Sequence, residues 1–509
     1  MKKIISCVLL ALATLCVKAQ NSYDVMRFMG DELVGTAGFV GMGGAMSALG
    51  ADISTIATNP AGIALYRSND VAFSLAMNSV ENKTDFLGTS LKSDKNSFAV
   101  NNLGLVFSTN IEMGSLKYVN FAFNYRRRNS FANNLEIAGS LFDADNNFFS
   151  QQYELKELYD QSSDYLGYED YYNLEYPWLG LLTSTSGLID PNDGSLMYVP
   201  GGAGGLFPDK MNYFSNEKGG VNDVDVNVSF NIDDMLYFGV TLSASNVDYT
   251  RYSEYQEHDD NYNYYTLQNR YNISGHGFGV KLGAIVRPFE YTPFKIGFAI
   301  HTPTWYSLTD CSSAAMIGTD DAVWDTRDYD CYGEDVLVDY DFTTPWRMNV
   351  SASYTFDNFA AVDAEYELVN WSSAELEYVD GAKMGLLNDC IESNMKAQHI
   401  FRVGALFKLD ENFSLRCGYN YMTAPFKKEA AKMQLKMQDT STEFENKYET
   451  NILTFGAGYA GEHLYFDIAY KLAMQKSDFY NYYDSDYYNP AATVKTNRNS
   501  LVATLGFRF

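Results

Sequence analysis

Apolar and polar residues alternate with a period of two along most of the chain from residue 69 onward. In residues 464–474, for example, one face carries Leu464, Phe466, Ile468, Tyr470, Leu472 and Met474. This period is typical of β-strands that have one apolar face. No stretch after the N-terminus approaches the roughly 18 consecutive apolar residues of a membrane-spanning helix. The chain is therefore predicted to be all-β, either a soluble sandwich or a membrane barrel.

The connections between the alternating runs favour the barrel. Short turns are expected near residues 110–114, 232–234, 288–293, 356–358, 409–412 and 460–462, and long loops near 81–96, 132–220, 251–274, 309–341, 372–396, 425–450 and 477–493. Alternating short and long connections predict a transmembrane antiparallel β-barrel of about 14 strands over residues 69–509, with short periplasmic turns and long extracellular loops. The last strand, which ends at Phe509, is expected to pair with the first near residues 71–80 and so remove the sheet edges.

Composition agrees with a barrel in an outer membrane. Aromatic residues make up 15% of the chain, with 40 Tyr. Tyrosine settles at membrane–water boundaries, so this excess favours aromatic girdles. The formal net charge of −27 disfavours nucleic acid as a partner.

The N-terminus carries an export signal. Lys2 and Lys3 precede the apolar run 4–17, and Ala19 offers a small residue for cleavage. We therefore expect residues 1–19 to be a secretory signal peptide, removed on the way to the bacterial outer membrane.

The stretch 41–66 is rich in small residues and turn signals. Glycines allow close packing and positive φ, while Asp and Asn cap short helical turns and Pro fits the first helical position. The residues expected to shape this stretch are Gly41, Gly43, Gly44, Asp52, Asn59, Pro60, Ala61 and Gly62. They predict two short turns that are too small to fold alone.

These residues resemble the hatch of the FadL/TodX family, outer-membrane transporters of long-chain fatty acids and other hydrophobic compounds. The resemblance implies that residues 20–68 plug the barrel lumen. It further implies passive uptake of small hydrophobic compounds through hatch displacement and lateral exit into the bilayer. Fatty acids or other hydrophobic molecules, outer-membrane lipid and lipopolysaccharide would then be the partners of a monomer that is not an enzyme and needs no cofactor.

The resemblance also suggests where the wall opens. In the family, a kink in the third strand opens the wall toward the bilayer, and Asn124, Tyr125 and Arg126 end the third strand of this chain. Arg126 stands where a kink-permitting glycine is expected, so the sequence does not fix the position of the lateral opening.

Charged side chains are expected on the lumen face. Assuming that the apolar face meets lipid, these are Lys281, Lys295, Arg347, Arg402, Arg416, Lys471 and Arg508, with Asp363, Glu365, Glu367 and Asp467. Two readings remain: a network that holds barrel and hatch together, because unpaired charge in a closed lumen is costly, or a cation that meets a ligand carboxylate. The ligand-binding residues are unknown at this stage.

Histidines and cysteines give little sign of chemistry. The five histidines lack metal-ligand spacing, so no metal site and no catalytic site is predicted. Cys311 and Cys331 lie in one outer loop of an exported chain. They are expected either to form a disulfide or to remain two free thiols. Cys417 alternates with Phe413 and Leu415 and is expected to face lipid as a free thiol.

Two rival functions remain. A closed barrel with acidic, Tyr-rich outer loops could be a surface interaction or adhesion protein, and a haem or porphyrin receptor is a further alternative. A lipid bound inside the barrel would separate transport from adhesion.

Overall fold

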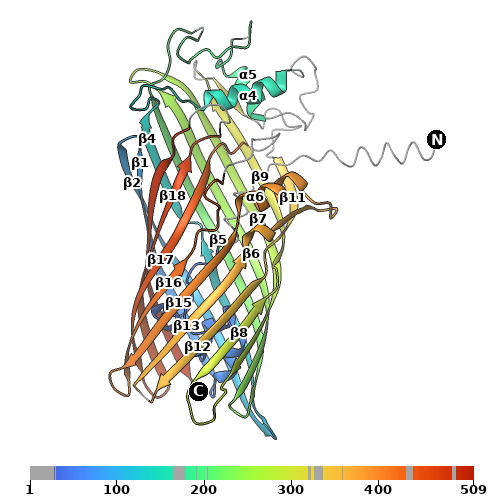
Figure 1. Cartoon of the computed structure of the whole chain (residues 1–509), viewed down its shortest axis with the longest axis vertical. Coiled ribbons are helices and arrows are strands. Elements are labelled where there is room, and N and C mark those ends of the chain that lie inside the picture. The colour runs from blue at the N-terminus through green and yellow to red at the C-terminus, as the bar shows by residue number, and fades with distance from the viewer. Residues whose placement is uncertain are drawn as a thin grey trace, which may run out of the picture.

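The computed structural model describes residues 28, 30–163, 178–190, 192–202, 204–318, 322–325, 336–357, 359–430, 440–483 and 489–509. The predicted signal peptide and Cys331 lie outside these residues. Figure 1 shows a tall barrel of inclined strands with short helices at one end.

The wall is a closed antiparallel barrel of 14 strands, as predicted. Single elements form most of it: β1 (Asp70–Phe86), β2 (Thr89–Met113), β5 (Lys210–Ile232), β6 (Leu236–His258), β7 (Asn263–Val286), β15 (Ala397–Lys408), β16 (Phe413–Met422), β17 (Phe444–Ala460), β18 (Leu464–Tyr480) and β19 (Ala492–Arg508). The last strand pairs with the first, Asp70 lying opposite Arg508, so the ring closes.

The other wall strands are each built from two elements end to end. They are β3 (Leu116–Ser130) with β4 (Asn133–Ser140), β8 (Lys295–His301) with β9 (Trp305–Ile317), β12 (Arg347–Phe356) with β11 (Val336–Thr343), and β13 (Ala360–Asn370) with β14 (Glu375–Tyr378). A short strand, β10 (Val323–Asp325), pairs with β9. Two of these four breaks contain a proline, Pro303 between β8 and β9 and Pro345 between β11 and β12, and proline cannot donate to the ladder.

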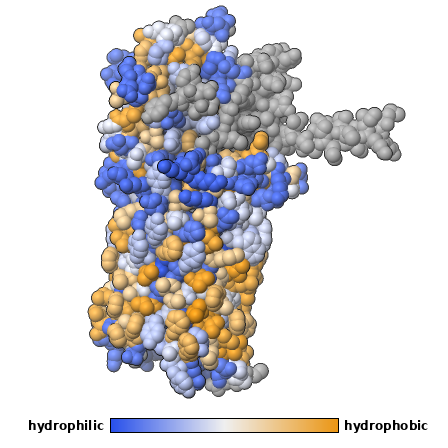
Figure 2. Space-filling view, in the orientation of Figure 1, coloured by the Kyte–Doolittle hydropathy of each residue, from blue (hydrophilic) through white to orange (hydrophobic). Residues whose placement is uncertain are grey.

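Side-chain alternation places the apolar face outside. In β6, Phe238, Val240 and Leu242 are exposed while the residues between them are buried. Figure 2 shows hydrophobic side chains gathered over the lower part of the barrel and hydrophilic ones above them. Among the described helices, none is both long enough and apolar enough to cross a membrane.

The short turns fall where the sequence predicts them, but several predicted long loops are instead β-structure. β1 and β2 are joined by a tight turn at residues 87–88, and β6 and β7 by residues 259–262. Their outer halves carry polar and tyrosine side chains on both faces, so the apolar contrast that marks a strand is weak there. The loop predicted at 132–220 contains β4 and two helices, α4 (Gln152–Ser163) and α5 (Trp178–Thr185).

Two groups of residues fill the barrel. Toward the short turns lies the N-terminal segment, residues 28 and 30–68, with α3 (Ala37–Gly41), η1 (Ile53–Ala57) and η2 (Pro60–Leu65). Toward the long loops lies an apolar core that includes Leu155 and Leu158 of α4 and Leu179 and Leu182 of α5. Beside the wall, η4 (Trp371–Ser373) and α6 (Gly385–Asn394) pack on a second apolar core.

Candidate functional site: a chamber inside the barrel

The N-terminal segment is shaped by the two caps that the sequence predicts. The Asp52 carboxylate accepts a hydrogen bond from the Ser54 N–H at 2.8 Å and starts η1. The Asn59 side chain accepts one from the Ala61 N–H at 3.1 Å, with Pro60 in the first turn of η2. Both capping predictions are confirmed.

Close backbone contacts fix this segment against the wall on two sides. A Cβ on Gly41 would lie 3.3 Å from the Gly456 Cα, and a Cβ on Gly418 would lie 2.3 Å from the Gly43 nitrogen. On the other side, a Cβ on Gly239 would lie 2.3 Å from the Pro60 carbonyl oxygen. Only glycine allows such approach, so the segment from 37 to 66 is tightly held.

The remaining predicted residues have local roles. Gly43 and Gly44 have φ of 67° and 81°, a region that L side chains rarely adopt. A Cβ on Gly62 would lie 2.4 Å from the Thr55 Oγ1. Ala61 is fully buried against the wall.

The predicted lumen charges are mostly paired. Arg402 contacts Glu365 and Glu367, Arg416 contacts Asp467 at 2.5 Å, Lys281 contacts Asp225 at 3.0 Å, and Arg508 contacts Asp70 at 3.4 Å. Two others hold the N-terminal segment: Asp363 accepts from the Leu49 N–H at 2.7 Å, and Lys295 donates to the Leu49 carbonyl at 2.9 Å. Most of these charged side chains therefore belong to a network that holds the barrel and the N-terminal segment together.

Residues 30–33 of the same segment are held differently, by charge. Asp31 contacts Arg347 and lies 3.3 Å from Arg128, and Glu32 lies 3.4 Å from Arg498. Lys471 donates to the Leu33 carbonyl at 3.0 Å.

Residues 30–33 form one side of a chamber of about 250 Å³ between the N-terminal segment and the outer core. Its apolar lining includes Leu33, Phe131, Trp371, Ile400, Met422, Phe426, Phe444 and Ile452. Its charged lining includes Asp31, Glu32, Glu217, Arg251, Arg347, Glu443, Glu445, Lys447, Lys471 and Arg498. A chamber with both kinds of lining suits a molecule that is partly apolar and partly charged.

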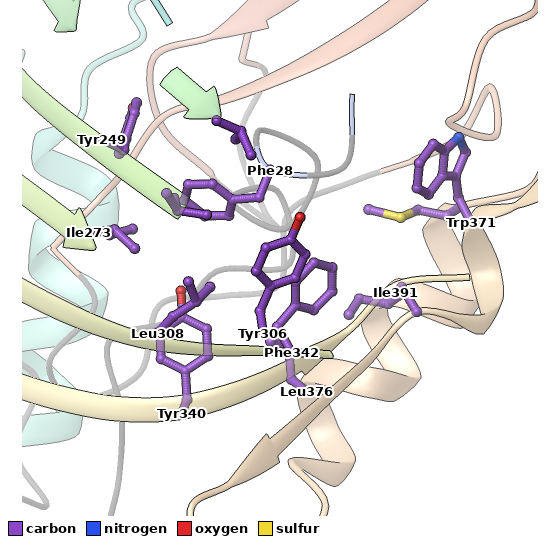
Figure 3. Packing of buried hydrophobic residues seen from close by; sticks show 14 of the residues in the cluster. Phe28, Tyr249, Ile273, Tyr306, Leu308, Tyr340, Phe342, Trp371, Leu376 and Ile391 are labelled. Carbon is purple, nitrogen blue, oxygen red and sulfur yellow. The ribbon is translucent and has the colours of Figure 1, made fainter. Parts of the chain in front are cut away.

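Aromatic side chains line one side of this interior. Phe28 meets Phe131 and Tyr249 edge to face with ring centroids 5.9 Å apart in each pair, and Tyr306 stacks on Phe342 at 6.0 Å (Figure 3). The Arg128 guanidinium donates to the Tyr306 hydroxyl. The aromatic contacts of Phe28 with Phe131 and Tyr249 thus join the N-terminal segment to the wall.

A buried carboxylate fastens the outer core above the chamber. Glu257 of β6 accepts hydrogen bonds from the Ser150 hydroxyl at 2.7 Å, the Gln151 N–H at 2.9 Å and the Tyr255 hydroxyl at 2.9 Å. These bonds tie the residues at the start of α4 to β6 at the long-loop end of the barrel.

The β2–β3 ladder ends beside the predicted opening. Asn124, Tyr125 and Arg126 are still paired with β2, Arg126 lying opposite Asn102. Beyond this point, within the described residues, β2 pairs with β1 alone and β4 pairs with β5 alone. Side chains bridge the gap instead: the Ser93 hydroxyl donates to the Asn134 carbonyl at 2.9 Å.

Arg126 and its neighbours form a charged cluster that sequence reasoning missed. Arg126 lies 2.9 Å from Asp223, and Arg128 lies 3.6 Å from the same carboxylate. Asp223 and Asp225 are two residues apart on β5, so both side chains face the lumen. This spacing was the only sign in the sequence that they lie on the same face. Asp31 and Glu32 could not be found in this way, because they belong to no strand.

The cysteines and histidines show no assembled site. Cys311 lies on β9, and its predicted partner Cys331 falls outside the described residues, so the disulfide stays a prediction. Cys417 is a free thiol on the outward side of β16, as predicted. In the described part of the chain, no group of three His, Cys, Asp or Glu side chains could hold a metal ion.

Comparison with known proteins identifies the fold. No family model matches the sequence, and no curated protein matches it. A Pseudomonas aeruginosa FadL homologue aligns with a TM-score of 0.53 at 12% identity, covering 93% of this chain and 98% of that one. The Pseudomonas putida toluene transporter TodX aligns with a TM-score of 0.52 at 11% identity, covering 95% and 100%. Together with the 14-strand count, these alignments show that the chain has the fold of the FadL and TodX outer-membrane barrels.

Proposed function

We propose that this chain is an integral outer-membrane protein that takes up small hydrophobic molecules by passive diffusion, and that it works as a monomer among outer-membrane lipid. The observation that carries the proposal is the chamber of about 250 Å³, which is partly apolar and lies inside a barrel with an apolar exterior. An apolar molecule gains roughly 0.8 kcal/mol for each CH₂ group that it buries. A partly apolar chamber inside the barrel therefore retains such cargo, whereas a wide aqueous pore lined by polar residues would not.

The charged lining favours cargo that carries a carboxylate, as a fatty acid does. Lys471 is buried and donates one hydrogen bond to a backbone carbonyl, so its ammonium can donate another to a ligand carboxylate at the chamber wall. Arg498 lies nearby on β19 and holds Glu32 at 3.4 Å, a contact that a ligand carboxylate can replace. We assign these two cations as the ligand-binding residues.

The hatch role of residues 20–68 belongs to the same proposal. The side-chain contacts of Asp31 and Glu32 are ionic and lie on the chamber side, with one backbone hydrogen bond from the Glu32 N–H to the Arg128 carbonyl at 3.2 Å. The segment around Gly41, Gly43 and Asn59 is instead held by close backbone packing. Fewer contacts must therefore break to release residues 30–33 than to release the whole N-terminal segment. Cargo that displaces these residues would open the chamber.

Lateral exit is proposed at the gap between β2 and β4, immediately beyond Asn124, Tyr125 and Arg126. There the wall lacks backbone pairing between β2 and β4 among the described residues, so opening it breaks side-chain contacts and no backbone ladder. Ser130, Asn133 and Leu135 on this side also line the chamber.

The test measures binding of decanoate and of decanol to the purified barrel. A charged hydrogen bond contributes about 1.5–3 kcal/mol, so Lys471→Met should weaken decanoate binding at least tenfold. Decanol, which lacks the carboxylate, should bind both forms within twofold. The matched control is Lys408→Met, at an exposed position next to a short turn.

Failure would take a recognisable form. If neither probe binds the wild-type barrel and no lipid co-purifies with it, the transport proposal is wrong and an interaction role comes first. If both probes bind equally well to all variants, transport stands and the assignment of Lys471 is wrong.

A further inference from the structure

Four lysines form a single cross-strand row on the outer surface. Lys476 of β18 lies opposite Lys495 of β19, Lys495 opposite Lys83 of β1, and Lys83 opposite Lys92 of β2. All four side chains are exposed. With strands about 4.8 Å apart, the row extends over roughly 14 Å of the wall. We call these residues the lysine row.

Such a row is unfavourable by itself. Like charges directly opposite each other destabilise a sheet, and Lys and Arg make up only 37 of the 509 residues of this acidic chain. Within the described residues, Glu81 is the sole ion-pair partner of the row, at 2.7 Å from Lys92 and 3.5 Å from Lys83. Lys476 and Lys495 form no ion pair there.

The acidic side chains next to the row do not neutralise it fully. Asp85 accepts a hydrogen bond from the Ser90 hydroxyl at 2.7 Å, and Asp478 accepts one from the Tyr448 hydroxyl. Asp94 adds an attraction to Lys92. The two lysines on β18 and β19 therefore keep ammonium groups available for an external anion.

The position of the row relative to the apolar surface indicates which anion. Six residues closer to the short turns, the same outward face carries Tyr470, Leu501, Met77 and Phe98. Six residues at about 3.3 Å each, inclined by about 40°, place the row roughly 15 Å beyond this apolar row along the barrel axis. That is the polar layer above the acyl chains, on the side of the long loops.

We propose that the lysine row binds the phosphate groups of lipopolysaccharide in the outer leaflet. A molecule whose acyl chains lie on the apolar residues below and whose phosphates reach the row satisfies both parts of this surface. The binding relieves the repulsion among the four ammonium groups, which explains why they are in register. Because the row lies outside the barrel, this inference is independent of the chamber and of uptake.

The experiment compares the purified full-length barrel with the variant Lys83→Gln/Lys92→Gln/Lys476→Gln/Lys495→Gln. The probes are rough lipopolysaccharide and the same lipopolysaccharide after enzymatic removal of phosphate. We expect the variant to bind the phosphorylated form at least tenfold more weakly. Dephosphorylated lipopolysaccharide should bind both proteins alike. Bound phosphate per barrel and the dissociation constant are the readouts.

A control with equal charge change replaces four exposed lysines elsewhere: Lys383, Lys396, Lys408 and Lys428. This variant should bind like the wild type. If the fourfold row variant does not assemble, the double variant Lys476→Gln/Lys495→Gln gives the same comparison. Equal binding by the row and control variants, or equal binding of both lipopolysaccharides to the wild type, overturns the proposal. Saturable binding of an acidic peptide that excludes lipopolysaccharide would make the partner a protein instead.

Discussion

Asn59 connects the fold of the N-terminal segment to the wall through one buried side chain. Its oxygen caps η2, and its amide donates to the Ala284 carbonyl of β7 at 3.3 Å. A cap of this kind contributes about 1 kcal/mol. That is small beside a closed ring of strand pairs, but it is comparable with the difference between two shapes of a gate.

We therefore predict that Asn59→Ala assembles normally and alters uptake of hydrophobic compounds. Heat-modifiable barrel in the outer membrane measures assembly, and accumulation of an apolar fluorescent probe measures uptake. Asn59→Asp is the control, because it keeps the capping oxygen and loses the bond to Ala284. Wild-type uptake in Asn59→Ala would contradict a gating role for this turn.

Labelling of Cys417 can test whether the outer surface of β16 faces lipid. Cys417 is flanked on its strand by exposed Leu415 and Tyr419. An apolar maleimide should label it in intact membranes, while a charged maleimide of similar size should not, because lipid excludes the charged reagent. Mass spectrometry of the labelled peptide checks this, with Cys417→Ser as the blank. Preferential labelling by the charged reagent would place β16 outside the apolar band.

At the scale of elements, the sequence predicts those features that a single strand or turn encodes. Alternation locates the wall strands, and Asp52 and Asn59 mark the starts of η1 and η2, because caps are local. β4 was not predictable, since Leu135 and Ile137 become a strand only through pairing with β5. The ionic contacts of Asp31 and Glu32 depend on strands hundreds of residues away. The chamber is therefore visible only in three dimensions.

Glycines on β16 and β17 let the N-terminal segment pack closely against the wall. We predict that Gly418→Val lets the barrel assemble but moves residues around Gly43, since even a Cβ there would lie 2.3 Å from the Gly43 nitrogen. Single-channel recording in planar bilayers should show larger or more frequent openings. Gly385→Val is the control, because a Cβ at Gly385 meets nothing within 4 Å. Identical recordings from both variants would mean that the segment does not block the lumen.

At the scale of the whole molecule, wall and filling are separable. The wall closes through strand pairs from β1 to β19, none of which involves the N-terminal segment. Between the short turns and the gap beside β2 and β4, the described strands pair into a ring, and a bilayer requires such pairing because it cannot hydrate a sheet edge.

We predict that deletion of residues 20–68 gives a barrel that still inserts and shows heat-modifiability. The emptied lumen is lined by polar residues such as Asn120, Asn227 and Ser229, so ions should pass through it. Conductance in planar bilayers measures this, with the full-length chain as reference. An assembled but non-conducting deletion barrel would show that the outer core seals the lumen alone.

The glycine contacts between segment and wall have an evolutionary consequence. Each joins a wall glycine to backbone atoms of the segment, as Gly418 meets the Gly43 nitrogen and Gly239 meets the Pro60 carbonyl oxygen. Because every residue carries these backbone atoms, no substitution in the segment relieves the collision, so the wall positions should stay glycine among descendants of this chain. A plug transplanted from another barrel of the same architecture would meet a wall with different recesses. Plugs and walls of this architecture are thus matched sets rather than interchangeable parts.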